Sequence, residues 1–225
     1  MKIPDQAFKV GCVYEIPENL SYEEASLTEP LSACYRGQRK LGIKPGDVVA
    51  IIGAGPIGMM HLKLAKAVGA AKVIISEIDE RRCKIAEGLG ADYVINPMKE
   101  DLEKKVLELT NGHGADAVIV AVGVGQAQKD ALKIVAKGGR INFFAGLPAG
   151  KEEVLINTNL IHYKQITVLG TSMQTPYEFK KTLDLLVSGV IDVKPLITHR
   201  YKLEEGIRAF QTAMKIEGLK VVINP

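Results

Sequence analysis

The sequence contains no tryptophan, few aromatic residues and only three cysteines, which lie far apart. Cys12, Cys34 and Cys83 form no CxxC pair. They therefore exclude a tetrahedral zinc cluster of cysteines, which needs four close ligands. We expect three reduced thiols in a cytoplasmic protein. No apolar run reaches the roughly 18 residues of a membrane-spanning helix, and the first residues lack the apolar centre of a secretory signal.

The charged residues also lack any clustering of one sign. The 29 lysines and arginines are interspersed with 26 aspartates and glutamates, for a net charge of +3. A nucleic-acid-binding face needs clustered basic residues, so we expect neither nucleic acid nor a membrane as a partner. Hydrophobic residues make up 47% of the 225 residues, which is enough to bury a normal core.

The sequence does contain an alternation of apolar runs and helical patterns, which is typical of βαβ units. Between the expected strands, glycines stand where helices should stop. The pattern predicts an α/β fold with a Rossmann-type, doubly wound, parallel six-stranded sheet. The expected strands are 47–52, 72–77, 93–95, 116–121, 140–144 and 165–169, and the expected helices are 58–68, 80–89, 100–110 and 126–136.

The flanking segments predict a small second layer. Residues 1–20 carry two prolines and short apolar pieces, and we expect extended strands there. Capping boxes that begin at Ser21 and Thr175 predict two helix starts. The C-terminal region is expected to hold a strand near 196–203, a short helix over 203–215 and a final strand near 219–224.

A glycine motif, Gly53-x-Gly55-x-x-Gly58, follows the first apolar strand and opens a helix. Gly53 permits a tight turn, Gly55 lets the backbone approach a pyrophosphate, and Gly58 lets the helix pack near the strand. The helix N-terminus offers N–H donors and a partial positive charge. The strand before the motif and the helix after it are the required context. The motif therefore predicts a dinucleotide-binding site.

Glu77 stands nineteen positions after Gly58, at the end of the second strand. A carboxylate at this place can accept both adenosine ribose hydroxyls and repels a 2′-phosphate, which favours NAD over NADP. Arg81 and Arg82 follow closely, and an arginine there can accommodate a 2′-phosphate. Alternatively, Glu77 is only a polar strand end and the arginines are a solvated helix face.

The stretch GIKPGDVVAIIGAGPIGMMHLKLAKAVGAAKVIISEID, residues 42–79, resembles the cofactor domain of zinc-type medium-chain alcohol dehydrogenases. The resemblance is greatest to the polyol and threonine dehydrogenase branch. YEIPENLSYEEASLTEPLSACYRG, residues 14–37, is similar to the segment that joins the catalytic domain to the cofactor domain. The segments GADAVIVAVG, GGRINFFAGLP, IHYKQITVLGTS and EGLKVVINP extend the likeness to the end of the chain.

The resemblance implies three regions. Residues 1–37 correspond to a junction with the β-rich catalytic domain, 38–172 to the NAD-binding domain, and 173–225 to a segment returning toward the catalytic domain. The catalytic domain supplies the cysteine and Gly-His-Glu zinc ligands and the proton relay, and no segment of this sequence matches it. We therefore expect no catalytic residues here. By similarity, Glu29 in TEPL approaches the zinc, but alone it is not expected to hold it.

Further cofactor contacts are implied by the resemblance alone. Pro56 and Ile57 belong to the glycine loop, and Ile57 resembles the residue that packs on the nicotinamide. Lys220 resembles a basic residue that reaches the pyrophosphate, although it is equally well explained as an edge-strand lysine. The loops beneath the nicotinamide ribose and around its carboxamide are expected at Val122, Gly123 and Val124, and at Ala145, Gly146 and Leu147.

The functional prediction is the NAD(H)-binding part of a zinc-dependent alcohol or polyol dehydrogenase. One alternative is a stand-alone module that binds NAD(H) without chemistry. Another is a zinc-free, quinone-reductase-like oxidoreductase, although the acidic residue of TEPL is unusual for that branch. We also expect a homo-oligomer that forms through the edge strand near 165–169, in keeping with the family. The four histidines share no ligand spacing.

Overall fold

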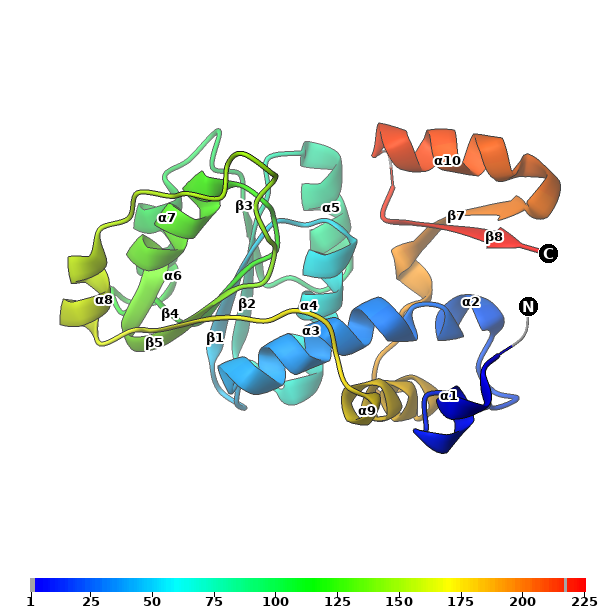
Figure 1. Ribbon diagram of the computed structural model, residues 1–225. Helices are drawn as coiled ribbons and strands as arrows, with labels where there is room; N and C mark the ends of the chain where they lie inside the picture. Colours follow the sequence, from blue (N-terminus) through cyan, green and yellow to red (C-terminus); the bar gives the residue numbers. More distant parts are fainter. Residues whose placement is uncertain (1–2, 217) are drawn as a thin grey trace. The chain divides into compact units, whose positions relative to one another are not determined.

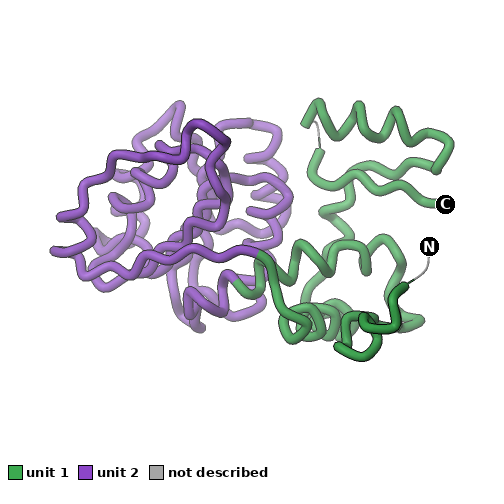
Figure 2. Tube along the Cα trace, in the orientation of Figure 1, with its two compact units in different colours: residues 1–36, 173–225 green, residues 37–172 purple. Residues whose placement is uncertain are grey.

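The computed structural model describes residues 3–216 and 218–225 (Figure 1). The chain forms two compact units (Figure 2). Unit 1 consists of residues 1–36 and 173–225, and unit 2 of residues 37–172. Among the described residues, no helix is both long enough and apolar enough to span a bilayer.

Unit 2 is built on six parallel strands in the order β3-β2-β1-β4-β5-β6. This is the strand order of dinucleotide-binding Rossmann domains, in which a ligand sits where the order reverses, outside the carboxyl ends of the strands. The reversal lies between β1 and β4, which pair from Val49–Ala117 to Ile52–Val120. The strands are β1 (Val48–Ile52), β2 (Lys72–Ser76), β3 (Tyr93–Ile95), β4 (Ala115–Val120), β5 (Val135–Phe143) and β6 (Thr167–Gly170).

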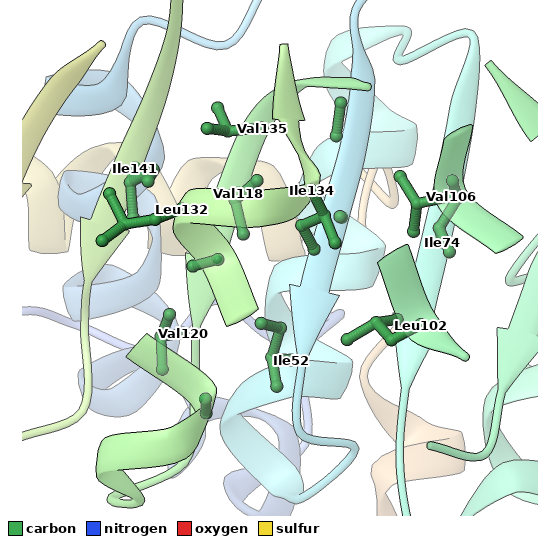
Figure 3. Packing of buried hydrophobic residues seen from close by; sticks show 14 of the residues in the cluster. Ile52, Ile74, Leu102, Val106, Val118, Val120, Leu132, Ile134, Val135 and Ile141 are labelled. Atoms are coloured by element: carbon green, nitrogen blue, oxygen red, sulfur yellow. The ribbon is translucent and has the colours of Figure 1, made fainter. Parts of the chain in front are cut away.

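Helices cover both faces of this sheet, which explains why its central strands are apolar throughout rather than alternating. On one face, α6 (Leu102–Leu109) and α7 (Gly125–Ile134) pack on alternate residues of the strands, including Ile52, Ile74 and Val118 (Figure 3). The other face packs against α4 (Pro56–Val68), while α5 (Glu80–Gly88) contacts β3. The core is therefore continuous beneath the reversal point.

A polar network ties together the amino ends of the strands. The Arg140 guanidinium donates to the Asp47 carboxylate at 2.6 Å, to the Gly42 carbonyl at 2.8 Å and to the Asp116 carbonyl at 3.4 Å. The Asp116 carboxylate in turn accepts from the Val48 amide at 2.8 Å. These bonds join β1, β4 and β5 at the end opposite the reversal-point loops.

The predicted six-stranded parallel sheet is confirmed, with differences at two places. The helix expected to reach residue 136 ends at Ile134, and β5 starts at once, because buried Val135 pairs with Ala115 across a register shift. A helix that the sequence did not indicate, α8 (Thr158–Lys164), starts at an N-cap where Asn157 accepts from the Asn159 amide.

Unit 1 carries the flanking segments. The two strands expected in the C-terminal region are present as β7 (Ile197–Lys202) and β8 (Lys220–Asn224). They form a parallel pair. Both predicted capping boxes are present, with the Ser21 and Thr175 amides donating to Glu24 and Glu178. The helices are α1 (Asp5–Lys9), α2 (Tyr22–Ala25), α3 (Thr28–Leu41, which continues into unit 2), α9 (Pro176–Val187) and α10 (Gly206–Lys215), with 3-10 turns at Lys194–Leu196 and Leu203–Glu205.

The prediction of extended strands over residues 1–20 is wrong for the described part of that segment. Residues 5–9 form α1, a single exposed turn of helix, and residues 12–17 are irregular. Pro4 precedes the helix in extended backbone, a position that proline favours. Tyr14 stacks on Phe179 of α9, with ring centroids 4.9 Å apart, and its hydroxyl donates to the Pro176 carbonyl. The segment is therefore fixed by α9 rather than by a sheet.

α10 lies along β7 and β8 (Figure 1). Several of its apolar side chains are exposed. Ile207, Phe210 and Met214 of α10 follow the 3-4 spacing of one helix face and are 79%, 69% and 80% exposed. Leu203, in the 3-10 turn just before α10, is 65% exposed. Soluble monomers rarely leave so continuous an apolar stripe uncovered.

We therefore expect the purified chain to self-associate in a concentration-dependent way, and Phe210→Gln to weaken this association. Sedimentation velocity over a range of concentrations measures it. Leu155→Gln, which replaces an exposed apolar residue of unit 2 outside this stripe, is the matched control. A chain that stays monomeric at all concentrations would contradict the expectation.

Candidate functional site

The turn between β1 and α4 requires glycine at two positions. Gly53 has φ of +106°, in the left-handed region that disfavours other residues. A Cβ on Gly58 would lie 1.9 Å from the Gly53 carbonyl oxygen, so helix and strand approach as closely as backbone allows. The two residues therefore set the path of the chain from β1 into α4.

Gly55 differs from these two because a Cβ there would meet no protein atom within 4 Å. Its backbone is extended, at φ −69° and ψ −178°, and it is the N-cap of α4. Pro56 occupies the first helical position, where it costs no hydrogen bond. The structure thus leaves open space over Gly55 at a helix N-terminus, where an anion is stabilised by N–H donors and the helix dipole.

The Glu77 carboxylate lies directly after β2 and is buried, with 8% of the residue exposed. Its Oε2 accepts from the Ala54 amide at 2.7 Å, and its Oε1 accepts from the amides of Ile78 at 2.8 Å and Asp79 at 3.0 Å. Glu77 therefore connects the turn after β1 to the turn after β2.

Asp79 caps α5. Its carboxylate accepts from the Arg81 and Arg82 amides, and the Arg81 guanidinium donates to it at 2.8 Å. The bond from Arg81, helped by these amides, lowers the pKa of Asp79 to about 2. The Arg81 guanidinium therefore bonds to the N-cap residue of its own helix. The Nε atom of Arg82, in contrast, is buried and has no hydrogen-bond partner among the described residues.

The loops after β4 and β5 lie against each other and against the glycine turn. A Cβ on Gly123 would lie 2.7 Å from the Gly146 carbonyl oxygen, and one on Gly53 would lie 3.1 Å from the Val122 Cβ. The Ala145 amide donates to the Val120 carbonyl, which holds the second loop in place. Half-exposed Val124 is the N-cap of α7, and Leu147 is partly buried.

Thirteen of the fourteen residues expected to bind the cofactor thus lie in unit 2, on the loops at the carboxyl end of one sheet or in the first turns of the helices that follow them. The fourteenth, Lys220, and the expected metal ligand, Glu29, belong to unit 1. Glu29 is exposed in the first turn of α3 and accepts from the Gln174 amide nitrogen at 3.0 Å. Lys220 begins β8 and pairs with Ile197.

Metal binding is not supported by the described residues. Within residues 3–216 and 218–225, no three His, Cys, Asp or Glu side chains come together in a way that could hold a metal ion. A catalytic zinc site needs about three protein ligands, so the one carboxylate of Glu29 does not fit zinc.

Sequence reasoning missed two features of the site. The first is that the carboxylates of Glu77 and Asp79 accept hydrogen bonds from backbone amides. The role of Asp79 could have been predicted, because an aspartate directly before a helix is a common N-cap signal. The second is a buried polar pair behind the glycine turn. Gln38 Nε2 donates to the His61 carbonyl at 2.7 Å and contacts the ring Nδ1 at 3.2 Å, and His61 is fully buried on α4. No local sequence signal pairs these two residues.

The strand order and the open glycine turn at a helix N-terminus define unit 2 as a dinucleotide-binding domain of the Rossmann class. A family model described as "Zinc-binding dehydrogenase" matches residues 56–188, which is more than half of the chain. The chain therefore belongs to the zinc-binding dehydrogenase family.

Similar proteins agree with this assignment. The chain is 34% identical to a sorbitol dehydrogenase of Bacillus subtilis, over 95% of the chain and 60% of that enzyme. It is 40% identical to an L-threonine 3-dehydrogenase of Pyrococcus furiosus, over 84% of the chain and 54% of that enzyme. The chain thus spans 60% and 54% of the lengths of these two relatives.

Solved structures show the same fold. An alcohol dehydrogenase from Thermus sp. ATN1 superimposes with a TM-score of 0.86 at 31% identity, covering 94% of the chain and 61% of that protein. A protein of Sinorhizobium meliloti described as a zinc-binding dehydrogenase, solved with bound NADP, gives 0.85 at 29% identity, covering 94% and 62%. The resemblance inferred from the sequence motifs is confirmed.

Proposed function

We propose that this chain is the NAD(H)-binding portion of a zinc-dependent alcohol or polyol dehydrogenase that oxidises a secondary alcohol. The observation that carries the proposal is the open space over Gly55, at the N-terminus of α4 and beside the reversal point of the sheet. A pyrophosphate fits this place because it needs backbone donors and a close approach.

The chain's own residues would hold and orient the cofactor. The turn from Gly53 to Gly58 receives the pyrophosphate, and Glu77 and Arg82 lie toward the adenosine side. The loops at 122–124 and 145–147, with Ile57, bind the nicotinamide half. When bound, the nicotinamide supplies the hydride acceptor or donor, while the protein supplies position and electrostatics.

We propose that zinc chemistry is not competent in this chain by itself. Glu29 is the one residue that we assign to the metal side, and a single carboxylate does not hold zinc tightly. The alternative function is a module that binds NAD(H) without chemistry. It is supported by the same open space over Gly55. A zinc-free reductase remains a further alternative.

The deciding test is calorimetric titration of the purified chain with NADH and with NADPH, together with a zinc assay on the same sample. We expect one NADH site per chain, weaker NADPH binding and no stoichiometric zinc. NADPH binding more tightly than NADH would reverse the assignment of the cofactor. Stoichiometric zinc would overturn the incomplete-site proposal.

Gly55→Ala is the matched variant for this titration. Its extended backbone accepts alanine, and the new methyl group contacts no protein atom, so the fold and its unfolding temperature should be unchanged. The methyl group does occupy the space assigned to the pyrophosphate, so we expect NADH affinity to fall at least tenfold. Unchanged affinity would place the cofactor elsewhere.

The assembly and location of the protein are also proposals. β6 is an edge strand of the sheet, and Thr167–Gly170 is available for pairing with a second copy. Lys220 is proposed to reach the pyrophosphate. Three free thiols, at Cys12, Cys34 and Cys83, favour a reducing compartment such as the cytoplasm.

A further inference from the structure

We infer that Glu77 is also a positioning residue, which holds the glycine turn in its binding conformation in addition to its proposed place beside the adenosine ribose. This inference rests on the proposed NAD(H) site. The starting point is the set of partners of its carboxylate. Three backbone amides, those of Ala54, Ile78 and Asp79, already donate to it at 2.7–3.0 Å.

The acceptor capacity of the carboxylate limits what else Glu77 can bind. An ionised carboxylate offers about four lone-pair positions, two on each oxygen. Oε1 already accepts from Ile78 and Asp79, and Oε2 accepts from Ala54. About one position therefore remains, on Oε2. Most of the acceptor capacity of Glu77 thus serves the protein's own backbone.

The Ala54 bond reaches the part of the turn that matters for binding. Ala54 lies between Gly53 and Gly55 and is itself fully buried. The amide just before it, that of Gly53, donates to the Ser76 carbonyl at 2.8 Å. Two successive amides of the glycine turn are thus attached to the end of β2, and the second is held by a charged acceptor, the stronger kind of hydrogen bond.

The same carboxylate also fixes the start of α5. Oε1 holds the Asp79 amide, and the Asp79 carboxylate accepts from the Arg81 and Arg82 amides. A continuous series of bonds therefore runs from Ala54 through Glu77 and Asp79 to the helix that carries Arg82. One buried carboxylate therefore positions the backbone on both the pyrophosphate side and the adenosine side of the proposed site.

The test compares Glu77→Gln with Glu87→Gln, which removes an equal charge from an exposed position on α5. A glutamine can still accept on one oxygen but presents a donor to the other amides. Because hydrogen bonds to charged groups are the costly ones to lose, we expect Glu77→Gln to weaken NADH and 2′-deoxy-NADH alike, by roughly tenfold or more. Glu87→Gln should leave both affinities unchanged.

A residue that acts only on the ribose gives a different pattern. In that case Glu77→Gln weakens NADH but has a clearly smaller effect on the 2′-deoxy cofactor, and this result overturns the inference. The thermal unfolding of Glu77→Gln is measured alongside, and the affinities are compared well below its unfolding temperature, so that loss of fold is not read as loss of binding.

A second measurement does not depend on cofactor binding. Amide hydrogen exchange of the unliganded protein reports the Ala54 N–H directly, and we expect Glu77→Gln to accelerate its exchange at least tenfold while leaving buried Ile119 in β4 unchanged. An unchanged Ala54 rate overturns the positioning role. If the wild-type chain binds no cofactor but Ala54 exchange responds, the proposed function fails while the role of Glu77 in shaping the turn stands.

Discussion

Gly58→Ala is expected to destabilise the protein by about 3 kcal/mol or more and to abolish NADH binding. The added Cβ would lie 1.9 Å from the Gly53 carbonyl oxygen and 3.0 Å from its carbon, and both are backbone atoms. Overpacking a rigid contact costs about 1–3 kcal/mol and sometimes more, so α4 must move away from β1. That movement displaces the helix N-terminus that is proposed to receive the pyrophosphate.

Urea unfolding and calorimetric titration measure the two effects of Gly58→Ala. For a chain of this size, 3 kcal/mol corresponds to a fall of roughly 6–12 °C in unfolding temperature. Gly55→Ala is the control, since a methyl group there meets no protein atom. Wild-type stability in the Gly58 variant would show that the close approach of helix and strand is not maintained in solution.

The second expected result concerns acid. Burial lowers the pKa of His61 to about 3, below its ordinary value near 6.5. Between these values the unfolded chain binds a proton that the folded protein does not, so stability rises with pH across this window. At pH 5 the folded protein should have lost about 2 kcal/mol of unfolding free energy relative to pH 8 through this residue alone.

Urea unfolding at pH 5 and pH 8 tests this expectation. His61→Gln keeps an acceptor near Gln38 but cannot titrate, so the loss between the two pH values should be about 2 kcal/mol smaller in this variant. His113→Gln, at an exposed turn, should behave like the wild type. Equal pH dependence in all three proteins would mean that His61 takes up its proton without unfolding.

The reason that His61 resists protonation lies in its surroundings. Gln38 presents an amide nitrogen, which can only donate, to Nδ1 at 3.2 Å, so the single proton of the neutral ring lies on Nε2. Nε2 is buried and has no partner among the described residues. The Phe144 ring stands edge-on at 4.6 Å between centroids. Among the described residues, no carboxylate is bonded to the ring to stabilise a positive charge.

The strand–turn–helix unit could be predicted from the sequence because its determinants are local. Gly53 and Gly58 follow an apolar strand at fixed spacing, and both the turn and the strand order are as expected. Helix capping was equally local at Ser21 and Thr175. Short-range rules of this kind need no knowledge of the rest of the molecule.

Features that depend on distant partners were not predicted. Residues 5–9 looked like part of a strand because of nearby prolines, but no neighbouring strand exists in the described chain to pair with them, and they form α1 instead. The Glu77 carboxylate is similar: its position was expected, but its bond to Ala54, 23 residues away, is visible only when β1 and β2 are placed side by side.

The network around Arg140 has a mechanical consequence. At the amino ends of β1, β4 and β5, one guanidinium and the Asp116 carboxylate hold neighbouring strands together. The loops proposed to receive the dinucleotide stand at the opposite ends of these strands and are held there by their own bonds, such as those of Glu77. Each end of the sheet thus has its own polar fastening, and a substitution in the loops leaves the bonds at the amino ends intact.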